Sequence, residues 1–443
     1  MNFVINLGVP HLGEQIFDYI DTPTLIQFRF VSHTWKIIAE NVLVNRWKDK
    51  DVLMSEEFDD DVDLQTQTIV VKLLLEHPKG NSINWNAINT EGWTPFMMAC
   101  ANGKSKMVQL FIDHSHTKNI DLNAKVDHST IDNGYTGFMF ACGNGQTEVV
   151  ETILDNSAIK QIDLNVKDCF GRTALFVACS YGKISVVKLL IDNPNIDLNA
   201  KDNDGVTPFM IMCIDDNLEV IKLFLKHSKA NNINLDSKDD YGNTPFHEAC
   251  IIGNLDVVKL LLDHSKANSI DLNSKDNNGK TGFHLACIEG NLDVIKLLLD
   301  HSKARNIDLN SRDNNGRTGF HIACINGNLD VVKLLLDHSK TKNIDLNSRA
   351  NNGNTAFHDA CMEDNVDVVK LLLDHSKANN IDLNSTDNDG NTAFHDACID
   401  GNVNVVKLLL TNAKEKEITI PKAEKIKEYN SVIQQLILEY AIS

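Results

Sequence analysis

The chain has 443 residues, 42% of them hydrophobic, and a formal net charge of −19. This acidic excess argues against a nucleic-acid or anionic-membrane surface, and without an 18-residue apolar run no transmembrane helix is expected. The N-terminus MNFVINLGVPHLGEQ lacks the basic and apolar regions of a secretory signal. We therefore expect an intracellular protein, cytoplasmic or also nuclear, too long for one compact core.

Residues 7–50 are predicted to form a small helical module. The segment Asp21-Thr22-Pro23 separates two helices, because proline suits the first turn of the second. A module of this size buries little apolar surface alone, so it needs a partner or a neighbouring domain. Its apolar residues recur at helical spacing, at Ile16, Ile20, Leu25, Phe28, Val31, Trp35 and Ile38.

This module resembles an F-box, a family with a Leu-Pro pair, an Ile-Phe-x-x-Leu helix, a D-P-x-x-L turn and a V-S-x-x-W signature. The matching residues are Val9-Pro10, Ile16-Phe17, Ile20-Asp21, Leu25, Val31-Ser32 and Trp35. The resemblance implies binding to a Skp-type adaptor, which docks F-box proteins on a cullin ubiquitin ligase. It assigns the adaptor contacts to Pro10, Ile16, Leu25, Val31 and Trp35. The alternative is a helical cap for the repeats that follow.

Two short segments separate this module from the repeats. Residues 51–63 hold seven acidic residues and no basic one, which is typical of a charged linker, although an acidic recognition patch is the alternative. Residues 64–84 contain Ile69–Leu75, which has the pattern of the second helix of a repeat without its first. We interpret 64–84 as a degenerate capping repeat.

A repeat of mostly 37 residues fills residues 85–410. Within one copy, from Lys275, a polar turn precedes two apolar stripes at helical spacing that Gly290-Asn291 separates. One helix pair cannot bury its apolar face alone, whereas a stack of pairs can. The pattern therefore predicts an all-α solenoid. Copies one to nine begin at Thr94, Thr136, Thr173, Thr207, Thr244, Thr281, Thr318, Thr355 and Thr392, at steps of 42, 37, 34 and then 37 residues.

These copies resemble the ankyrin repeat, with its T-P-L-H-x-A start, a Gly between the helices and V-V-K-L-L-L in the second helix. The sequence reads TPFHEAC at Thr244, TGFHLAC at Thr281, and TAFHDAC at Thr355 and Thr392. The resemblance implies an ankyrin-repeat solenoid of helix–turn–helix repeats with turn fingers. The family period is 33, and the extra residues, such as HSKANSIDLN from His264, predict a longer loop or a longer second helix.

Residues 411–443 are predicted to cap the open end of the last copy. Pro421 suits the first turn of a helix, and Ile426, Tyr429, Ile433, Leu436 and Tyr440 form one apolar stripe. A partner-binding helix is the alternative.

The cysteines and histidines follow the repeat rather than a metal or catalytic pattern. Nine of ten cysteines share one repeat position, where they are predicted to be small buried hydrophobes.

Five histidines, at 247, 284, 321, 358 and 395, stand three residues after the repeat Thr. The resemblance implies that this pair forms hydrogen bonds at the foot of the helix and to backbone between copies. A second series, at 114, 227, 264, 301, 338 and 375, is predicted to follow the second helix and suit its C-terminus. Without HExxH, phosphate-loop, GxSxG or CxxC motifs, we expect no enzyme activity, cofactor or metal.

The remaining surface is predicted to bind protein. The resemblance implies that partners meet the turn tips and the exposed end of the first helix. The tip candidates are Tyr241, Asn278, Asn315, Asn352 and Asp389. The helix-end candidates are Ile252, Ile288, Glu289, Ile325, Asn326, Met362, Glu363, Ile399 and Asp400.

Each helix-end pair begins with an apolar residue, at positions 251, 288, 325, 362 and 399. These residues either form an exposed ridge along the concave face, flanked by acid, or lie against their own turns. An exposed ridge would mark a site for a partner with an apolar stripe and basic character.

The favoured function is that of substrate receptor in a Skp–cullin–F-box ubiquitin ligase. The F-box-like module would bind the adaptor, and the ankyrin face would bind an unknown protein target and raise its effective concentration near the ligase. We expect a monomer outside this complex. The alternative is an ankyrin scaffold without a ubiquitin-ligase role.

Overall fold

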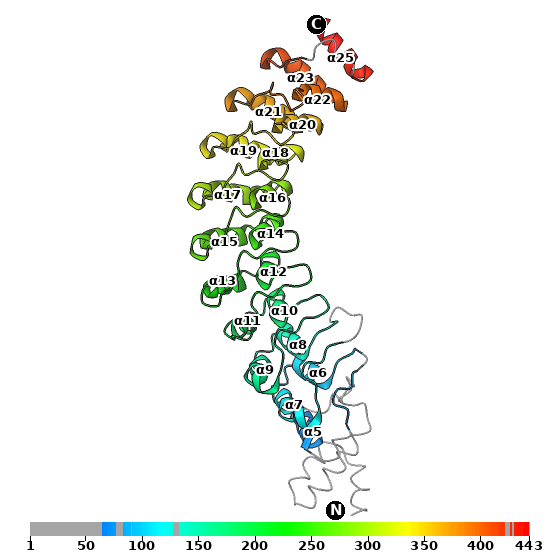
Figure 1. Ribbon diagram of the computed structural model, residues 1–443, viewed down its shortest axis with the longest axis vertical. Helices are drawn as coiled ribbons and strands as arrows, with labels where there is room; N and C mark the ends of the chain where they lie inside the picture. The colour runs from blue at the N-terminus through cyan, green and yellow to red at the C-terminus, as the bar shows by residue number, and fades with distance from the viewer. Residues whose placement is uncertain are drawn as a thin grey trace, which may run out of the picture. The chain divides into compact units, whose positions relative to one another are not determined.

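Figure 1 shows a computed structural model that describes residues 64–76, 83–89, 91–126, 133–420, 426–427 and 429–442. The predictions for residues 7–50, for the linker 51–63 and for a helix starting at Pro421 fall outside the described residues. The chain divides into an N-terminal unit that ends at Asn203 and a C-terminal unit that begins at Asp204.

The N-terminal unit contains seven helices in its described residues. They are α5 (Leu64–Glu76), α6 (Pro95–Ala101), α7 (Ser105–Lys118), α8 (Gly137–Asn144), α9 (Thr147–Lys160), α10 (Ala174–Ser180) and α11 (Ile184–Ile191). The first helices α6, α8 and α10 pack side by side, and so do the second helices α7, α9 and α11. Helix α5 packs on α7, as successive second helices do.

The C-terminal unit repeats the same pair five more times and a shorter pair once. Its helices are α12 (Pro208–Ile214), α13 (Leu218–His227), α14 (Pro245–Ile252), α15 (Leu255–Asn268), α16 (Gly282–Glu289), α17 (Leu292–Arg305), α18 (Gly319–Ile325), α19 (Leu329–Lys342), α20 (Ala356–Met362), α21 (Val366–Asn379), α22 (Ala393–Asp400), α23 (Val403–Lys416) and α25 (Ser431–Ile442). Figure 1 shows first and second helices forming two parallel layers in this unit. No strand occurs in the described part of the chain, and one antiparallel bridge joins Thr386 and Thr392. The predicted all-α class is therefore confirmed.

The repeat Thr begins each first helix. At Thr94 its hydroxyl accepts a hydrogen bond from the backbone N–H of Met97 at 3.3 Å, which satisfies a donor that the first turn leaves free. Phe246 and its equivalents then anchor each first helix in the core. The nine repeat cysteines are buried with them, as predicted.

The second helix explains the long period in most copies. In copy three, with a step of 34 residues, helix α11 has 8 residues. In copy six, with a step of 37, helix α17 has 14 residues and ends at Asn306, a left-handed cap with φ 55°. In copy six the extra residues therefore lengthen the second helix. In copy four, which also has a step of 37, helix α13 has 10 residues and the extra residues lie in the turns that follow it. Asparagine tolerates this left-handed conformation better than most residues do.

The second histidine series is placed differently from the prediction. His114 and His338 lie inside helices α7 and α19 rather than after them. Their Nδ1 atoms are 3.0 and 2.9 Å from the carbonyl oxygens of Leu110 and Leu334, one turn earlier. The helix continues through this polar segment because Ser339 and its equivalents return their hydroxyls to the helix backbone and are buried. Of this series, His227 alone ends its helix.

Helix α25 packs on α23 at the end of the last repeat. Asn430 caps α25, since its Oδ1 accepts a hydrogen bond from the Ile433 backbone N–H at 3.0 Å. Tyr429, Ile433 and Ile437 are buried. Of the predicted stripe, Leu436 and Tyr440 are half-buried.

Candidate partner-binding surface

The turn fingers of copies three, five, six, seven and nine are each built around one aspartate, whereas copy one has Asn89 and copy eight has Ala350 at this place. In copy six, Asp276 Oδ1 accepts hydrogen bonds from the backbone N–H groups of Asn278 at 2.9 Å and Lys280 at 2.7 Å. Gly279 completes the turn with φ 78°. A Cβ there would lie 2.7 Å from the backbone nitrogen of Asn314 in the next finger, so the fingers can stack closely only with glycine at this position.

The fingers of the C-terminal unit are tied to one another by asparagine. Asn314 donates from its backbone N–H to the Asn278 carbonyl at 2.9 Å and from its amide to the Asn277 carbonyl at 3.0 Å. The same pair of bonds recurs at Asn277, Asn351 and Asn388. The asparagine that precedes the tip residue, such as Asn277 before Asn278, therefore joins two repeats.

The predicted tip residues themselves face outward. Tyr241, Asn278, Asn315, Asn352 and Asp389 are all exposed. The structure thus brings the five predicted tip residues onto one edge of the C-terminal unit, in successive fingers.

The predicted apolar ridge is interrupted. Met362 and Ile399 are 37% and 61% exposed, whereas Ile251, Ile288 and Ile325 are half-buried. Ile252, beside the ridge, is 53% exposed. An asparagine of the next repeat bonds to the helix end at half-buried and exposed positions alike: Asn328 Nδ2 donates to the Ile288 carbonyl at 3.3 Å, and Asn402 Nδ2 donates to the Met362 carbonyl at 2.7 Å. An evenly exposed ridge through all five copies is therefore absent. The polar candidates Glu289, Asn326, Glu363 and Asp400 are exposed.

Two carboxyl groups that sequence reasoning missed lie near these helix ends. Asp359 in α20 and Asp396 in α22 occupy the same repeat position and are only 3% and 7% exposed. The Oδ2 atom of each has no hydrogen-bond partner. Burial raises the pKa of Asp359 to about 6 and that of Asp396 to about 7.

The buried histidines form a separate, satisfied series. His284 Nδ1 accepts a hydrogen bond from the Thr281 backbone N–H at 3.1 Å, so Nε2 carries the proton and donates to the Arg317 carbonyl at 3.1 Å. His247, His321 and His358 repeat this arrangement. Burial lowers the pKa of all four. The contacts implied by the resemblance are present, and they tie each copy to the next.

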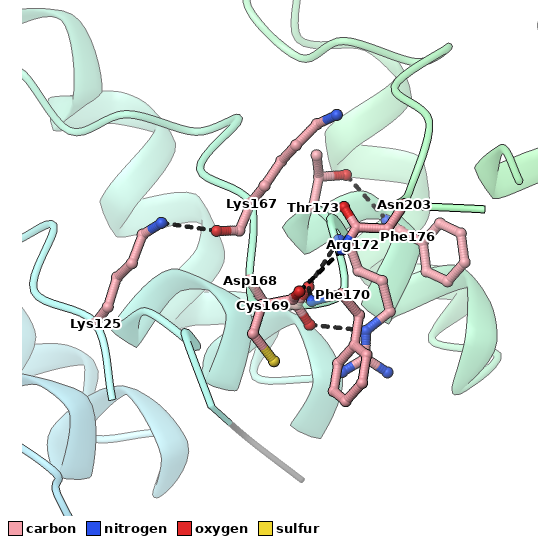
Figure 2. A network of polar contacts seen from close by, with 9 residues as sticks. All are labelled: Lys125, Lys167, Asp168, Cys169, Phe170, Arg172, Thr173, Phe176 and Asn203. Atoms are coloured by element: carbon pink, nitrogen blue, oxygen red, sulfur yellow. Dashed lines mark hydrogen bonds and ion pairs between the residues drawn. The ribbon is translucent and has the colours of Figure 1, made fainter. Parts of the chain in front are cut away.

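The N-terminal unit has a finger of different chemistry (Figure 2). Arg172 Nε donates to Asp168 Oδ2 at 2.7 Å, and its guanidinium lies 4.7 Å from the centre of the Phe170 ring. Lys125 and Lys167 each donate to a backbone carbonyl of the next copy, at 2.8 and 2.7 Å. Phe170 is half exposed, which adds an aromatic tip to this unit.

The comparisons with known proteins identify two families. The family of ankyrin repeats (3 copies) matches residues 64–160, 119–202, 194–276, 265–350 and 341–421. The chain therefore belongs to the ankyrin-repeat proteins. The F-box domain family matches residues 10–47, so the chain has the organisation of an F-box/ankyrin protein. Both families are typically non-catalytic binding modules.

The solved structures that are similar to the chain include the ankyrin repeat domain of Bcl-3, a unique member of the IkappaB protein family. It is 21% identical, covers 53% of this chain and 95% of its own, and has a TM-score of 0.45. No curated protein sequence matches the chain.

Among the described residues, none of the helices combines the length and the apolar character that crossing a bilayer requires. In the same residues, no group of three or more His, Cys, Asp or Glu side chains could hold a metal ion.

Proposed function

We propose that this protein is the substrate receptor of a Skp–cullin–F-box ubiquitin ligase. One observation carries the proposal: an F-box match at residues 10–47 and ankyrin repeats occur in the same chain. An F-box supplies attachment to the ligase, and a repeat surface supplies a binding face. Together they would place a target at high effective concentration near the ubiquitin-carrying enzyme.

The adaptor would contact Pro10, Ile16, Leu25, Val31 and Trp35, the residues that carry the F-box signature. Such a contact would insert an apolar helix face into a complementary groove. Residues 51–63 would then serve as a charged spacer, 64–84 as a degenerate capping repeat, and 411–443 as a C-terminal cap.

The target would bind the exposed finger tips and helix ends of the C-terminal unit. Support comes from their exposure and from the hydrogen-bonded asparagines that fix one finger against the next. A row of fingers held in this way loses little conformational entropy on binding.

Capture of a purified Skp-type adaptor by the full chain tests the proposal. We expect wild type to retain the adaptor and the double variant Leu25→Ala, Trp35→Ala to lose it. The matched control is Asp330→Asn with Asp367→Asn, which changes two exposed residues of the repeats and should capture adaptor normally. If wild type does not capture the adaptor, the protein is an ankyrin scaffold without a ubiquitin-ligase role.

A further inference from the structure

The last two repeats carry an acidic cluster that the fold does not require. We propose that Asp359 and Asp396, together with Asp387, Asp389 and Asp400, form a site for a cationic side chain of a partner protein, arginine above all. The inference deepens the proposed function and rests on it, because it assumes that the ankyrin surface binds the target.

The position of the two buried carboxyl groups is the first step. Helices α20 and α22 pack directly on each other, and Asp359 and Asp396 stand at the same point of each helix, one residue after the buried histidine. The side chain at this point is therefore presented in the same direction by two successive repeats.

The charges that act most strongly on Asp396 are those of other aspartates. After burial, the causes of its raised pKa are the charges of Asp387, Asp400, Asp389 and Asp359. Asp389 and Asp400 are exposed, and Asp387 is half-buried. A cation from outside would meet the exposed carboxylates first and the buried ones behind them.

Neither buried carboxylate is fully satisfied within the described part of the chain. Asp359 Oδ1 accepts one hydrogen bond, from Asn354 Nδ2 at 3.3 Å, and the charge of Arg317 acts on it from a distance. The Oδ2 atoms of both Asp359 and Asp396 remain without a partner. An orphaned acceptor at nine-tenths burial is costly, and a cation that supplies the missing bonds removes that cost.

The fold tolerates apolar residues at the same point. Six copies carry Met98, Phe140, Val177, Ile211, Leu285 or Ile322 there, and copy five carries Glu248. Leu285 and Ile322 are buried in the same unit, immediately before the two acidic copies. The carboxylates of copies eight and nine therefore contribute nothing that folding needs.

The chemistry favours arginine over a metal ion. Within the residues that the structure describes, no set of three ligand side chains is placed to hold a metal. A guanidinium is planar, weakly hydrated and able to bond two carboxylates at once. The exposed side chains of Met362 and Ile399 end the same two helices and can pack on the methylene stem of an arginine.

A labelled hexa-arginine peptide can probe the site on the full chain at physiological salt. We expect wild type to bind the peptide, and Asp359→Asn with Asp396→Asn to weaken binding by about tenfold, as for other hydrogen-bonded charge pairs. The exposed pair Asp389→Asn with Asp400→Asn should weaken it in the same direction. Asp330→Asn with Asp367→Asn removes the same charge from second helices and should change binding by no more than about twofold.

Two results would overturn the site: no binding of the peptide to wild type, or equal weakening in the test and control pairs. Adaptor capture is measured on the same preparations. All four proteins should capture adaptor equally, so a failure of the acidic site leaves adaptor binding intact, whereas a failure of the proposed function removes adaptor binding from all of them. Thermal melts confirm that each variant is folded.

Discussion

Copies six and seven differ from copies eight and nine in what they bury at one point of the first helix. All four have Thr, Phe and His at the start of the first helix, and all four have a V-V-K-L-L-L or V-I-K-L-L-L run in the second helix. At the point after His, copies six and seven bury Leu285 and Ile322, and copies eight and nine bury Asp359 and Asp396. The residues that all four copies share build the repeat. The residue after the histidine differs between the two pairs of copies, so it can serve a purpose other than folding.

The largest effect on stability is expected when aspartate is introduced at the same position in copies six and seven, which bury an apolar residue there. Leu285→Asp with Ile322→Asp buries two carboxyl groups where none exists, and should lower the free energy of unfolding by roughly 4 kcal/mol at pH 8. The control Leu285→Asn with Ile322→Asn is polar but uncharged and should cost less. Urea unfolding measures both, and equal losses would show that charge is not the cause.

A core leucine should behave identically in both kinds of copy. Leu298 in α17 and Leu372 in α21 are equivalent and fully buried, so replacement of either by alanine should cost about 3 kcal/mol through lost transfer energy and the cavity left behind. Thermal unfolding of the two variants is the measurement. A clear difference between them would mean that copies six and eight differ in more than the acidic position.

The reverse exchange should stabilise the acidic copies in a pH-dependent way. The folded pKa values of Asp359 and Asp396, about 6 and about 7, lie above the ordinary value of 3.8. The folded chain therefore keeps protons that the unfolded chain releases, and stability falls as pH rises from about 4 to about 7. We expect Asp359→Asn with Asp396→Asn to gain at least about 2 kcal/mol at pH 8 and almost nothing at pH 4.

The buried histidines act in the opposite sense. Their folded pKa values are lowered, to about 4 for His321, so the unfolded chain takes up protons first and stability falls as pH drops below the ordinary value of 6.5. Because wild type and the Asp→Asn variant share these histidines, the difference between their stability curves isolates the two carboxyl groups. A difference that does not depend on pH would contradict the account.

The smallest effect concerns one contact between successive repeats of the C-terminal unit, in which an aspartate takes the place of the usual asparagine. In copy six Asn273 Nδ2 donates to the Asn306 carbonyl at 2.7 Å, while its Oδ1 accepts from the Asp308 backbone N–H at 2.8 Å. Asp236 takes this place one copy earlier and accepts from the Asp271 N–H at 3.0 Å, but it has no amide to donate and its Oδ1 is unpartnered.

We therefore expect Asp236→Asn to raise the free energy of unfolding by about 1 kcal/mol, the usual net contribution of a hydrogen bond. Asn273→Asp is the matched reverse change and should lower it by a similar amount. Denaturant midpoints for both variants check this, and a loss of stability in Asp236→Asn would show that the aspartate serves a purpose the hydrogen bonds do not reveal.

Much of the fold could be predicted because a pattern that is weak in one repeat becomes clear when nine copies show it. The step from Thr281 to Thr318 and the paired apolar stripes defined the helix pair. The long second helix stayed ambiguous, since its last turns, such as HSKANS from His264, are polar and carry no apolar stripe. They remain helical because Ser265 turns its hydroxyl back to the Leu262 carbonyl at 2.8 Å and is buried.

The candidate surface was predicted only in outline. Asparagine is common in turns, and Asn278 and Asn315 were predicted as tip residues. Nothing in one copy showed that the amides of the preceding Asn277 and Asn314 join successive fingers. The buried carboxyl groups were missed because an acidic residue beside a helix start is usually solvated. The available signal was the comparison of copies: an acid at Asp359 and Asp396 where six other copies are apolar.

If both proposals hold, one chain binds the ligase adaptor and a basic target at the same time. Light scattering during size-exclusion chromatography of the full chain, mixed with a Skp-type adaptor and the labelled hexa-arginine peptide, tests this. We expect a single species that contains one chain and one adaptor and carries the peptide label. Separate elution of adaptor and chain, or loss of the peptide whenever adaptor is bound, would contradict it.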